Sequence, residues 1–337
     1  MKKFPWLFVS IITAMLIAWF SGISVLMYKV FVDPPQSDRD DPQPGRFYDD
    51  DVVEATRETD EAIERLRDNY SPLEVSIKTD DGLTLPGFFY INDKPTKNTF
   101  ICVHGYNTNS DFAFAAMVEP ILNAGYNCFL VNHRHFEGHE GKFTGFGILE
   151  KNELIKWIEC VNSYFPDGKI ILYGTSMGAA TIMQASDQDL TDNVVGFIED
   201  CGFTTCYDEF NYLMKSVTHL PSKPVIESMG FLTKAFLDLD IKASDSREAL
   251  KNTKLPALFI HGGRDNFVPT YMVEECYEAC GSEDKKLIIY DTARHVHSHF
   301  KYPEQYEKDI FEFAERIFNQ DKPVKKTEEK PEEEKAE

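Results

Sequence analysis

The stretch KIILYGTSMGAATIM, residues 169–183, places a serine between two glycines directly after an apolar run. The apolar run is typical of a short buried strand, and residues 179–183 are typical of the first turns of a helix. Where a strand and a helix meet in a tight turn, close packing favours residues without a Cβ, and Gly174 and Gly178 meet that need. The stretch therefore predicts an elbow of the pattern G-x-S-x-G with Ser176 exposed at its apex. An ordinary Gly-Ser turn is the alternative, and partners for the serine decide between the two.

The ends of two later apolar runs supply such partners. PALFIHGGRDNFVP, residues 256–269, carries Asp265 after its apolar run, and LIIYDTARHVHSHF, residues 287–300, carries His295 in the same place. Functional side chains gather outside the carboxyl ends of parallel strands. A serine hydroxyl is a weak nucleophile until a histidine takes its proton, and a carboxylate must orient that histidine. The pattern therefore predicts a catalytic triad of Ser176, Asp265 and His295.

The carboxylate of this triad has a rival in the sequence. Asp200 ends VVGFIED, residues 194–200, and would also lie at the end of a core strand. We prefer Asp265, because it directly follows the penultimate core strand in a glycine-rich loop that can turn its side chain towards His295.

Two backbone N–H groups are candidates for binding an oxyanion. TFICVHG, residues 99–105, is predicted as a strand, and Tyr106 follows it. The negative charge of a tetrahedral intermediate needs fixed donors. We expect the N–H groups of Tyr106 and Met177 to provide them.

Two groups of histidines raise the alternative of a metal site. No carboxylate lies at a ligand-like spacing from the first group, and a loop would scatter its side chains. The second group is interpreted as a loop at the end of a strand. We therefore expect no metal and no cofactor. The first group is His295, His297 and His299, and the second is His133, His135 and His139.

The chain contains seven cysteines, an odd number that cannot pair completely within one molecule. Cys102 and Cys128 lie inside apolar runs, where a thiol behaves as a small hydrophobic group. We interpret most of the cysteines as buried thiols and regard Cys201 and Cys206 as the local pair to be checked.

Charge excludes one class of partner. The 337 residues carry a formal net charge of −21. Nucleic-acid binding requires a basic surface, so nucleic acid is not expected as a partner. The same charge disfavours peripheral adhesion to anionic lipid.

The N-terminus predicts a membrane anchor. Residues 4–28 contain no charged side chain and are long enough to cross a bilayer as a helix. A cleaved signal peptide is the alternative, with Gly22-Ile23-Ser24 as its cleavage site, but the apolar run continues beyond that site. We prefer an uncleaved signal anchor, residues 1–32. Lysines before it and the acidic DPPQSDRDD, residues 33–41, after it favour a single-pass protein of the cell membrane with its catalytic domain on the extracellular side.

The remaining chain divides into a linker, one domain and a tail. Residues 33–69 are predicted as a Pro- and Asp-rich linker followed by a surface helix over residues 51–69. Residues 70–319 are predicted to form the folded domain. Residues 320–337 are rich in Lys, Glu and Pro without aromatic side chains, and we expect them to be disordered.

Within the domain, a hairpin signal at Asp81-Gly82 precedes a regular alternation of apolar strands and helices. Such alternation predicts an α/β fold with a mostly parallel central sheet covered by helices on both faces. Residues 206–240 interrupt the alternation with mixed apolar and aromatic residues. They are predicted as a small cap insertion over the active site.

These stretches resemble the α/β-hydrolase superfamily, especially the membrane-anchored bacterial hydrolases of the serine-aminopeptidase-like and acyl-esterase-like group. The resemblance covers roughly residues 73–318 and is carried by VHGY, EGKFTGFGILEKNELIKWI, LYGTSMGAATIM, FIEDCGFTT, LFIHGGRDNFVP and ARHVHSHF. It implies the α/β-hydrolase fold, with Ser176 as nucleophile, Asp265 as acid and His295 as base. Tyr106 and Met177 match the oxyanion-hole positions.

Two details of the resemblance concern histidines. His295 rather than His297 matches the family base, because the family pattern A-x-H is followed three residues later by Ser, here Ser298. The usual D-x-R-G-H-G is replaced by NHRHFEGHEG, which begins at Asn132 and has an extra loop residue or two. That segment shapes the pocket wall, so the departure weakens the inference of a substrate and leaves the triad intact.

The expected activity is hydrolysis of an ester or amide through an acyl-enzyme on Ser176. We prefer ester cleavage of a small or medium acyl group, with peptidase activity second. Acyl transfer fits the same residues, and a catalytically silent, membrane-tethered binding domain is the non-enzymatic alternative. The substrate would be a small ester, a lipid-like molecule or a peptide, with specificity set by residues 133–147 and 206–240.

Overall fold

The computed structural model describes residues 10, 21–22, 24–25, 29, 50–135, 140–218, 222–243 and 245–320. Most of the expected anchor and linker, and the tail after residue 320, therefore lie outside the described residues. Within these ranges, no helix combines the length and the apolar character that crossing a membrane requires.

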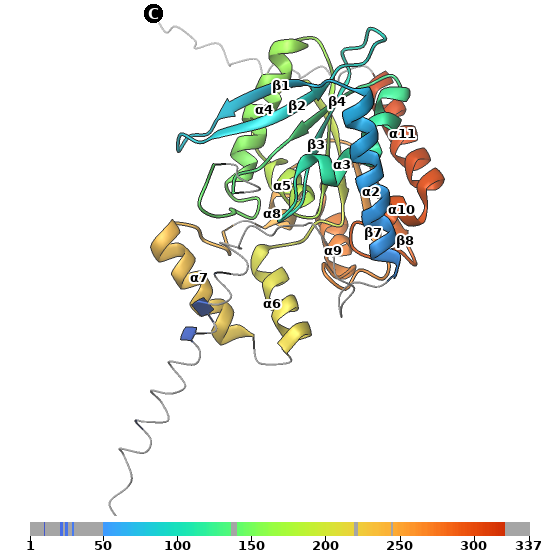
Figure 1. Ribbon diagram of the computed structural model, residues 1–337. Coiled ribbons are helices and arrows are strands. Elements are labelled where there is room, and N and C mark those ends of the chain that lie inside the picture. The colour runs from blue at the N-terminus through green and yellow to red at the C-terminus, as the bar shows by residue number, and fades with distance from the viewer. Residues whose placement is uncertain are drawn as a thin grey trace, which may run out of the picture.

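The molecule is built on an eight-stranded sheet in the order β1-β2-β4-β3-β5-β6-β7-β8 (Figure 1). β2 runs antiparallel to β1 and β4, and all other neighbouring strands are parallel. This arrangement confirms the predicted α/β fold. The strands are β1 (Leu73–Lys78), β2 (Thr84–Tyr90), β3 (Thr99–Val103), β4 (Asn127–Val131), β5 (Ile170–Thr175), β6 (Val194–Asp200), β7 (Ala257–Gly262) and β8 (Lys285–Tyr290).

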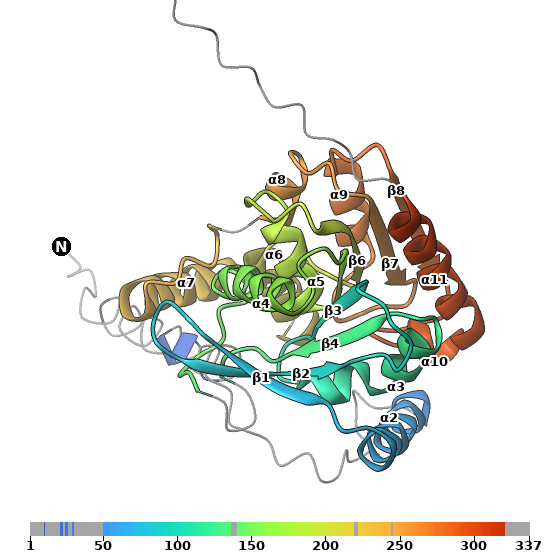
Figure 2. The same cartoon turned by 90° about the horizontal axis from the view of Figure 1, so that it is seen from above.

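Helices cover both faces of the sheet, and Figure 2 shows α4 and α5 on one side of the strands and α3 on the other. Parallel strands buried on both faces need apolar residues at every position. In β3, for example, Phe100 faces a cluster with α2, α3 and α11, whereas Ile101 faces a cluster with α4, α5 and α9. The helices are α2 (Asp50–Asn69), α3 (Ser110–Asn123), α4 (Glu150–Tyr164), α5 (Met177–Ala185), α6 (Cys206–Thr218), α7 (Lys223–Leu237), α8 (Ser246–Leu250), α9 (Tyr271–Ala279), α10 (Ser298–Lys301) and α11 (Pro303–Asn319).

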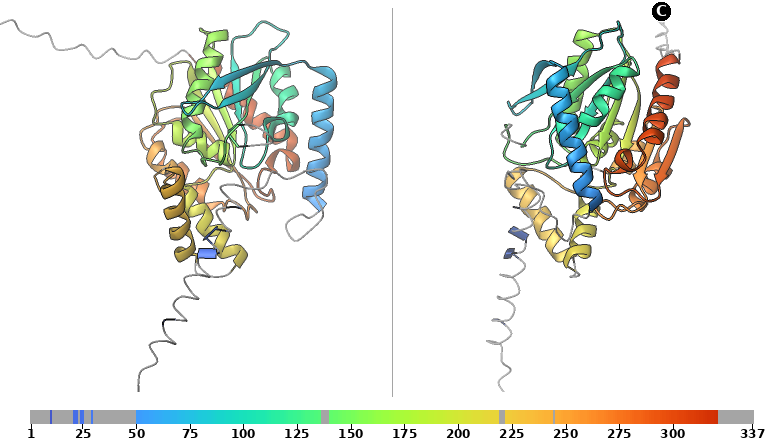
Figure 3. Two further views of the ribbon diagram at one scale, coloured as in Figure 1. Left: turned by 60° about the vertical axis from the view of Figure 1, so that its left-hand side comes forward. Right: turned by 45° about the vertical axis from the view of Figure 1, so that its right-hand side comes forward.

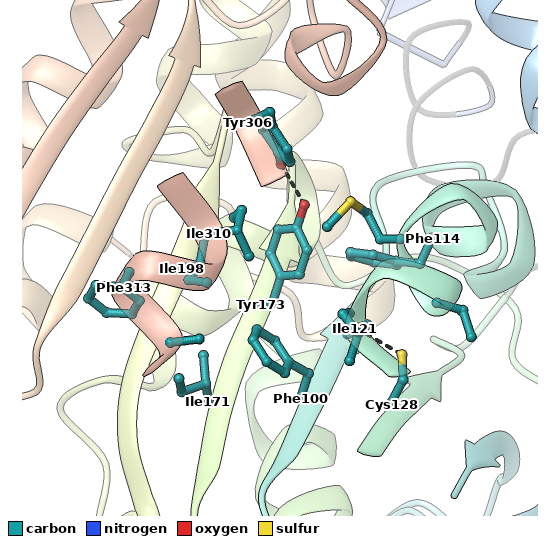
Figure 4. Close-up of a cluster of buried hydrophobic side chains, with 14 of the residues drawn as sticks. Phe100, Phe114, Ile121, Cys128, Ile171, Tyr173, Ile198, Tyr306, Ile310 and Phe313 are labelled. Carbon is teal, nitrogen blue, oxygen red and sulfur yellow. Dashed lines mark hydrogen bonds between the residues drawn. The ribbon is translucent and has the colours of Figure 1, made fainter. Parts of the chain in front are cut away.

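The first of these clusters includes a short polar chain inside apolar surroundings. Tyr173 of β5 and Tyr306 of α11 lie with their hydroxyl oxygens 2.5 Å apart, among Phe100, Phe114 and Ile310 (Figure 4). Two hydroxyl groups in a core must find hydrogen-bond partners. Their mutual contact fixes α11 on the sheet.

The predicted cap insertion contains two helices. α6 and α7 lie together beyond the carboxyl ends of the parallel strands (Figure 3). Their apolar faces form a third cluster, which includes Met177 and Phe146. This cluster, which we call the cap cluster, joins the insertion to the first turn of α5.

The surface helix predicted over residues 51–69 corresponds to α2, which begins at Asp50 and packs through Ala62 and Leu66 into the first core cluster. The cysteines are free thiols, so Cys201 and Cys206 form no disulfide.

Candidate active site

Ser176 occupies the turn between β5 and α5, with φ of 53° and ψ of −119°. A positive φ is rare for a residue with a side chain and stores backbone strain. A Cβ on Gly174 would come within 2.6 Å of the Ala179 nitrogen, and one on Gly178 would overlap the Val103 carbonyl. The elbow therefore requires both glycines, as the sequence predicts.

The structure brings Ser176, Asp265 and His295 together. His295 Nε2 lies 2.9 Å from Ser176 Oγ, and His295 Nδ1 lies 2.7 Å from Asp265 Oδ2. A carboxylate only accepts hydrogen bonds, so Nδ1 carries the proton and Nε2 is left to accept from the serine hydroxyl. This is the tautomer that removal of the serine proton requires.

One detail of the prediction is wrong. Ser176 was expected to be exposed, but only 6% of its surface is accessible. The residues after it pack into the cap cluster, which covers the turn. A serine shielded from bulk water reacts in a site of low dielectric constant, where fixed donors act strongly.

The carboxylate of Asp265 accepts three hydrogen bonds and faces a second histidine. Oδ1 accepts the N–H groups of Phe267 and Val268, both at 2.9 Å. Oδ2 faces His295 Nδ1 at 2.7 Å and His261 Nε2 at 3.3 Å. Burial alone would raise the pKa of Asp265, but the two histidines hold it well below its usual range. Asp265 is therefore ionised at neutral pH.

The rival carboxylate has another partner. Asp200 is buried, and its Oδ2 accepts the Tyr306 hydroxyl at 2.6 Å. Its backbone carbonyl accepts the Ser176 N–H at 2.8 Å. Asp200 thus stabilises the elbow through its backbone carbonyl, and Asp265 is the carboxylate that hydrogen bonds to His295.

The two predicted oxyanion donors flank the serine. Met177 is the first residue of α5, where the backbone N–H groups have no acceptor within the helix. A Cβ on Gly105 would lie 3.2 Å from the Ser176 Cβ, so the backbone that leads into Tyr106 passes directly beside the serine. The helix N-terminus also favours negative charge at this point.

Two family models match adjacent parts of the chain. One, described as the alpha/beta hydrolase fold, matches residues 98–211, and the other, described as serine aminopeptidase, S33, matches residues 210–299. The chain belongs to the α/β-hydrolase superfamily. Its predicted resemblance to that superfamily is thus confirmed.

The chain is also similar to curated proteins, and solved structures share its fold. YqkD of Bacillus subtilis (strain 168) is 27% identical over 274 residues, which cover 80% of this chain and 88% of YqkD. YfhR of Escherichia coli (strain K12) is 24% identical over 233 residues, which cover 68% of this chain and 75% of YfhR. The esterase Pf2001 of Pyrococcus furiosus superposes with a TM-score of 0.63 at 22% identity, covering 86% of this chain and 98% of that structure. An acylaminoacyl peptidase of Pyrococcus horikoshii gives 0.59 at 19%, with 75% and 42% covered.

In this α/β-hydrolase, two histidines hold the loop that carries Tyr106. The His133 N–H donates to His104 Nε2 at 3.0 Å, and His133 Nε2–H donates to the His104 carbonyl at 3.0 Å. His104 is then left with its proton on Nδ1, which donates to the Gly105 carbonyl at 2.8 Å. Burial lowers the pKa of His133, which stays neutral in this contact. Sequence analysis assigned His133 to a loop and missed this contact, because it joins residues 29 positions apart.

The segment that departs from the usual family pattern is fixed by polar contacts. Asn132 Oδ1 accepts the Ser110 N–H at 3.0 Å at the start of α3, an acceptor role that an aspartate could also fill. The Arg134 side chain donates to Glu153 at 2.7 Å and to Asp81 at 2.9 Å. Glu150 accepts two backbone N–H groups of the loop. The described residues of this segment are therefore fixed by hydrogen bonds and ion pairs.

The remaining predicted histidines do not converge on one point. His135 Nδ1 lies 3.4 Å from the Gly141 carbonyl, and His299 Nε2 lies 3.3 Å from Glu307. His139 lies outside the described residues. Ligand atoms of Cys201, Asp265 and His295 lie within 4.8 Å of one another. The acid and the base of that group are already hydrogen bonded to each other.

Another buried histidine, His261, contacts the acid of the triad. His261 Nε2 donates to the Val268 carbonyl at 2.9 Å and faces Asp265. Burial would lower the pKa of His261, but Asp265 and Glu199 raise it above its ordinary value. Burial raises the pKa of Glu199 to about 8. The spacing of four residues between His261 and Asp265 in HGGRD is the sequence signal for this contact, which was not predicted.

Apolar side chains pack around the residue that follows the serine. The cap cluster places Phe146, Phe210 and Met229 with Met177, and Tyr106 stacks on Phe146 with ring centroids 5.5 Å apart. The first turn of α5 is therefore held in apolar surroundings.

Proposed function

We propose that this α/β-hydrolase is a serine hydrolase that cleaves carboxylic esters through an acyl-enzyme on Ser176. The observation that carries the proposal is the unbroken hydrogen-bonded line from Ser176 through His295 to Asp265. No cofactor enters the reaction.

In the proposed reaction, Ser176 Oγ attacks the ester carbonyl carbon while His295 Nε2 takes the serine proton. The carbonyl oxygen becomes an oxyanion, which the N–H groups of Tyr106 and Met177 bind. His295 then gives its proton to the alcohol oxygen as the carbon–oxygen bond breaks. Asp265 keeps its charge throughout and stabilises the imidazolium.

A water molecule completes the cycle. His295 removes a proton from the water as its oxygen attacks the acyl-enzyme, and the same donors bind the second oxyanion. The carboxylic acid leaves when the proton returns to Ser176. The low pKa of Asp265 supports this role, because a carboxylate that stays ionised can stabilise the charged ring at each step.

The cap cluster favours esters with an apolar acyl group. Tyr106 and Met177, the proposed oxyanion donors, both contribute side chains to that cluster. The solved esterase Pf2001 of Pyrococcus furiosus has a similar fold. Acyl transfer would need an alcohol or amine acceptor in place of water at the same site.

An aminopeptidase is the second candidate, and Glu209 of α6 is the observation that favours it. Both of its carboxyl oxygens are buried, and neither has a hydrogen-bond partner within the described structure. Burial and the nearby Asp265 raise the pKa of Glu209 well above its ordinary value. A substrate ammonium group would be a suitable partner for this carboxyl group.

We further propose that residues 4–28 anchor the hydrolase in the cell membrane, with the catalytic domain on the extracellular side. The charge-free length of this stretch supports the proposal.

A serine-directed fluorophosphonate tests the chemistry. We expect it to modify Ser176 alone, and Ser176→Ala to abolish labelling without lowering the thermal midpoint. Labelling of another residue, or none in the folded protein, would contradict the proposal and favour a binding domain.

Paired substrates then separate esterase from aminopeptidase. Esters of graded acyl length and aminoacyl anilides are compared on the wild-type protein and on Glu209→Gln. An esterase prefers the esters and keeps kcat in the variant. An aminopeptidase prefers the anilides and shows a raised KM for them when the carboxyl group is removed.

A further inference from the structure

α7 carries two exposed aromatic side chains in its second half. Phe231 and Phe236 are accessible over 72% and 76% of their surface, more than any other large apolar side chain in the described ranges. Ala235 is also exposed, and Leu232 is half-buried. Single exposed apolar residues are ordinary, but two large exposed rings on one short segment mark a contact surface.

The same helix is apolar on its inner side. Val225, Ile226 and Met229 are buried in the cap cluster. A helix that is apolar on both sides lies between two apolar environments. The protein core provides one of them.

The N-terminal apolar stretch indicates the second environment. Its described residues, 21–22 and 24–25, lie beside α6 and α7 in Figures 1 and 3. Ser24 is completely buried there. These residues belong to the outer end of residues 4–28, so a bilayer crossed by that stretch would have its outer surface at the level of α7.

The charges of α7 suit such a position. Lys223 and Lys234 are exposed near its two ends, Lys234 in an ion pair with Asp238, and the exposed Glu227 pairs with Lys242. Amphipathic helices at a membrane surface insert aromatic residues and extend lysines towards the headgroups. The net charge of the chain opposes binding by charge alone, so apolar insertion must supply the attraction.

A cleft of about 950 Å³ adjoins this part of α7. Phe236, Leu237 and Phe143 line it together with the charged side chains of Lys142, Lys234 and Asp238. Phe143 and Leu237 also pack on the cap cluster, which contains Met177. The same apolar packing thus joins the exposed end of α7 to the first turn of α5.

We propose that α7 lies in the outer lipid surface with Phe231 and Phe236 inserted, and that the hydrolase takes amphiphilic esters directly from the bilayer. The proposal rests on the membrane anchor and the ester hydrolysis proposed above. It specifies the substrate class as esters with a membrane-soluble acyl chain.

The position of α7 is tested with an environment-sensitive fluorophore on full-length protein in phosphatidylcholine vesicles. The fluorophore is attached to Phe231→Cys and, as a control, to Ile91→Cys. Ile91 is similarly apolar, 49% exposed, and follows β2, which ends beside the start of β4 and therefore at the end of the sheet away from α7. Wild-type protein treated in parallel gives the background from native cysteines.

We expect a blue-shifted emission at position 231 that is quenched by spin-labelled lipids, and neither effect at position 91. If the protein floats with the vesicles but both labels behave alike, the inference is overturned and the anchor stands. A blue shift without lipid quenching would indicate a second copy of the chain on α7 and also overturns it. A protein that does not float contradicts the anchor and the inference together.

Kinetics test the delivery of substrate. Phe231→Asp with Phe236→Asp should leave kcat/KM for a short water-soluble ester unchanged. Hydrolysis of a long-chain ester in vesicles should fall by about tenfold or more, because two rings that would be buried among lipid are replaced by charged side chains. An equal effect on both substrates would show that the variant only disturbs the cap.

Discussion

Asp265 and Asp200 lie at the ends of neighbouring strands, but their hydrogen-bond partners give them different roles. The carboxylate of Asp265 contacts two histidine rings and accepts two backbone N–H groups, whereas that of Asp200 accepts a tyrosine hydroxyl. A carboxylate whose partner is the histidine ring controls the tautomer of that ring.

We therefore expect Asp265→Asn to lower kcat by on the order of 10⁴, as the equivalent change does in chymotrypsin-like proteases. Asp200→Asn should lower the thermal midpoint and change kcat much less. Both variants are compared by kcat for an ester and by thermal unfolding. A silent Asp200→Asn enzyme beside a fully active Asp265→Asn would show that the acid is misassigned.

His261 is a positioning residue for Asp265, since it touches the acid and not the serine. His261→Leu removes that polar contact and the hydrogen bond to the Val268 carbonyl, and we expect kcat to fall about tenfold with KM unchanged, because a buried polar contact to a charged group contributes on the order of 1.5 kcal/mol. His261→Gln should restore part of the loss. A purely structural role would instead lower the thermal midpoint in both variants without this rescue.

Glu199 makes stability depend on pH. Its pKa is about 8 in the folded protein and 4.5 ordinarily, so folding favours the protonated form. Its contribution to the free energy of unfolding is complete below about pH 4.5 and is lost as pH rises to about 8. Glu199→Gln lacks this loss, so its thermal midpoint relative to wild type should rise between pH 5 and pH 8.5. Glu283→Gln, at an exposed position, is the control, and an equal pH trend in both variants would contradict the assignment.

At the scale of elements, the tyrosine pair joins α11 to β5 and β6. Tyr306 donates to Asp200, and Tyr173 donates to Tyr306. Tyr306→Phe leaves a buried carboxylate and a buried hydroxyl without their partner, whereas Tyr173→Phe removes only the outer member of the chain. We expect Tyr306→Phe to cost about 1–3 kcal/mol or more and Tyr173→Phe distinctly less. Denaturant unfolding of the two variants measures this order, and equal losses would mean that Asp200 has another donor.

Elements whose first and last residues are marked by neighbouring residues in the sequence could be predicted. β5, β6 and β7 lie within a residue or so of their apolar runs, because glycine, proline or polar residues bound each run. The triad could be predicted because its members follow such strands. Contacts between distant segments could not. The His133–His104 contact and the burial of Ser176 depend on how loop and cap pack, which no local pattern encodes.

At the scale of the whole molecule, packing on the core determines which N-terminal segments can be removed without loss of stability. α2 precedes the sheet in the chain but is part of the core, because Ala62 and Leu66 are buried against α3 and its neighbours. It also borders the loop that carries His295, since Ala55 and Glu58 face Ala293 and Phe300 across a small cleft. A truncation should therefore be tolerated before α2 and not after it.

Deleting residues 1–32 should give a water-soluble protein that keeps the thermal midpoint and the kcat of the full chain on a short ester. Most of the removed stretch precedes a Pro- and Asp-rich linker, which is typical of a tether separate from the folded domain. Deleting residues 1–69 should lower both quantities, because it uncovers the apolar surface beneath α2 and frees the loop of His295. Thermal unfolding and ester kinetics of the two truncations decide the matter. If the shorter deletion already aggregates or loses activity on the soluble ester, the N-terminal stretch packs on the cap as part of the domain, and the boundary between tether and enzyme lies before residue 32.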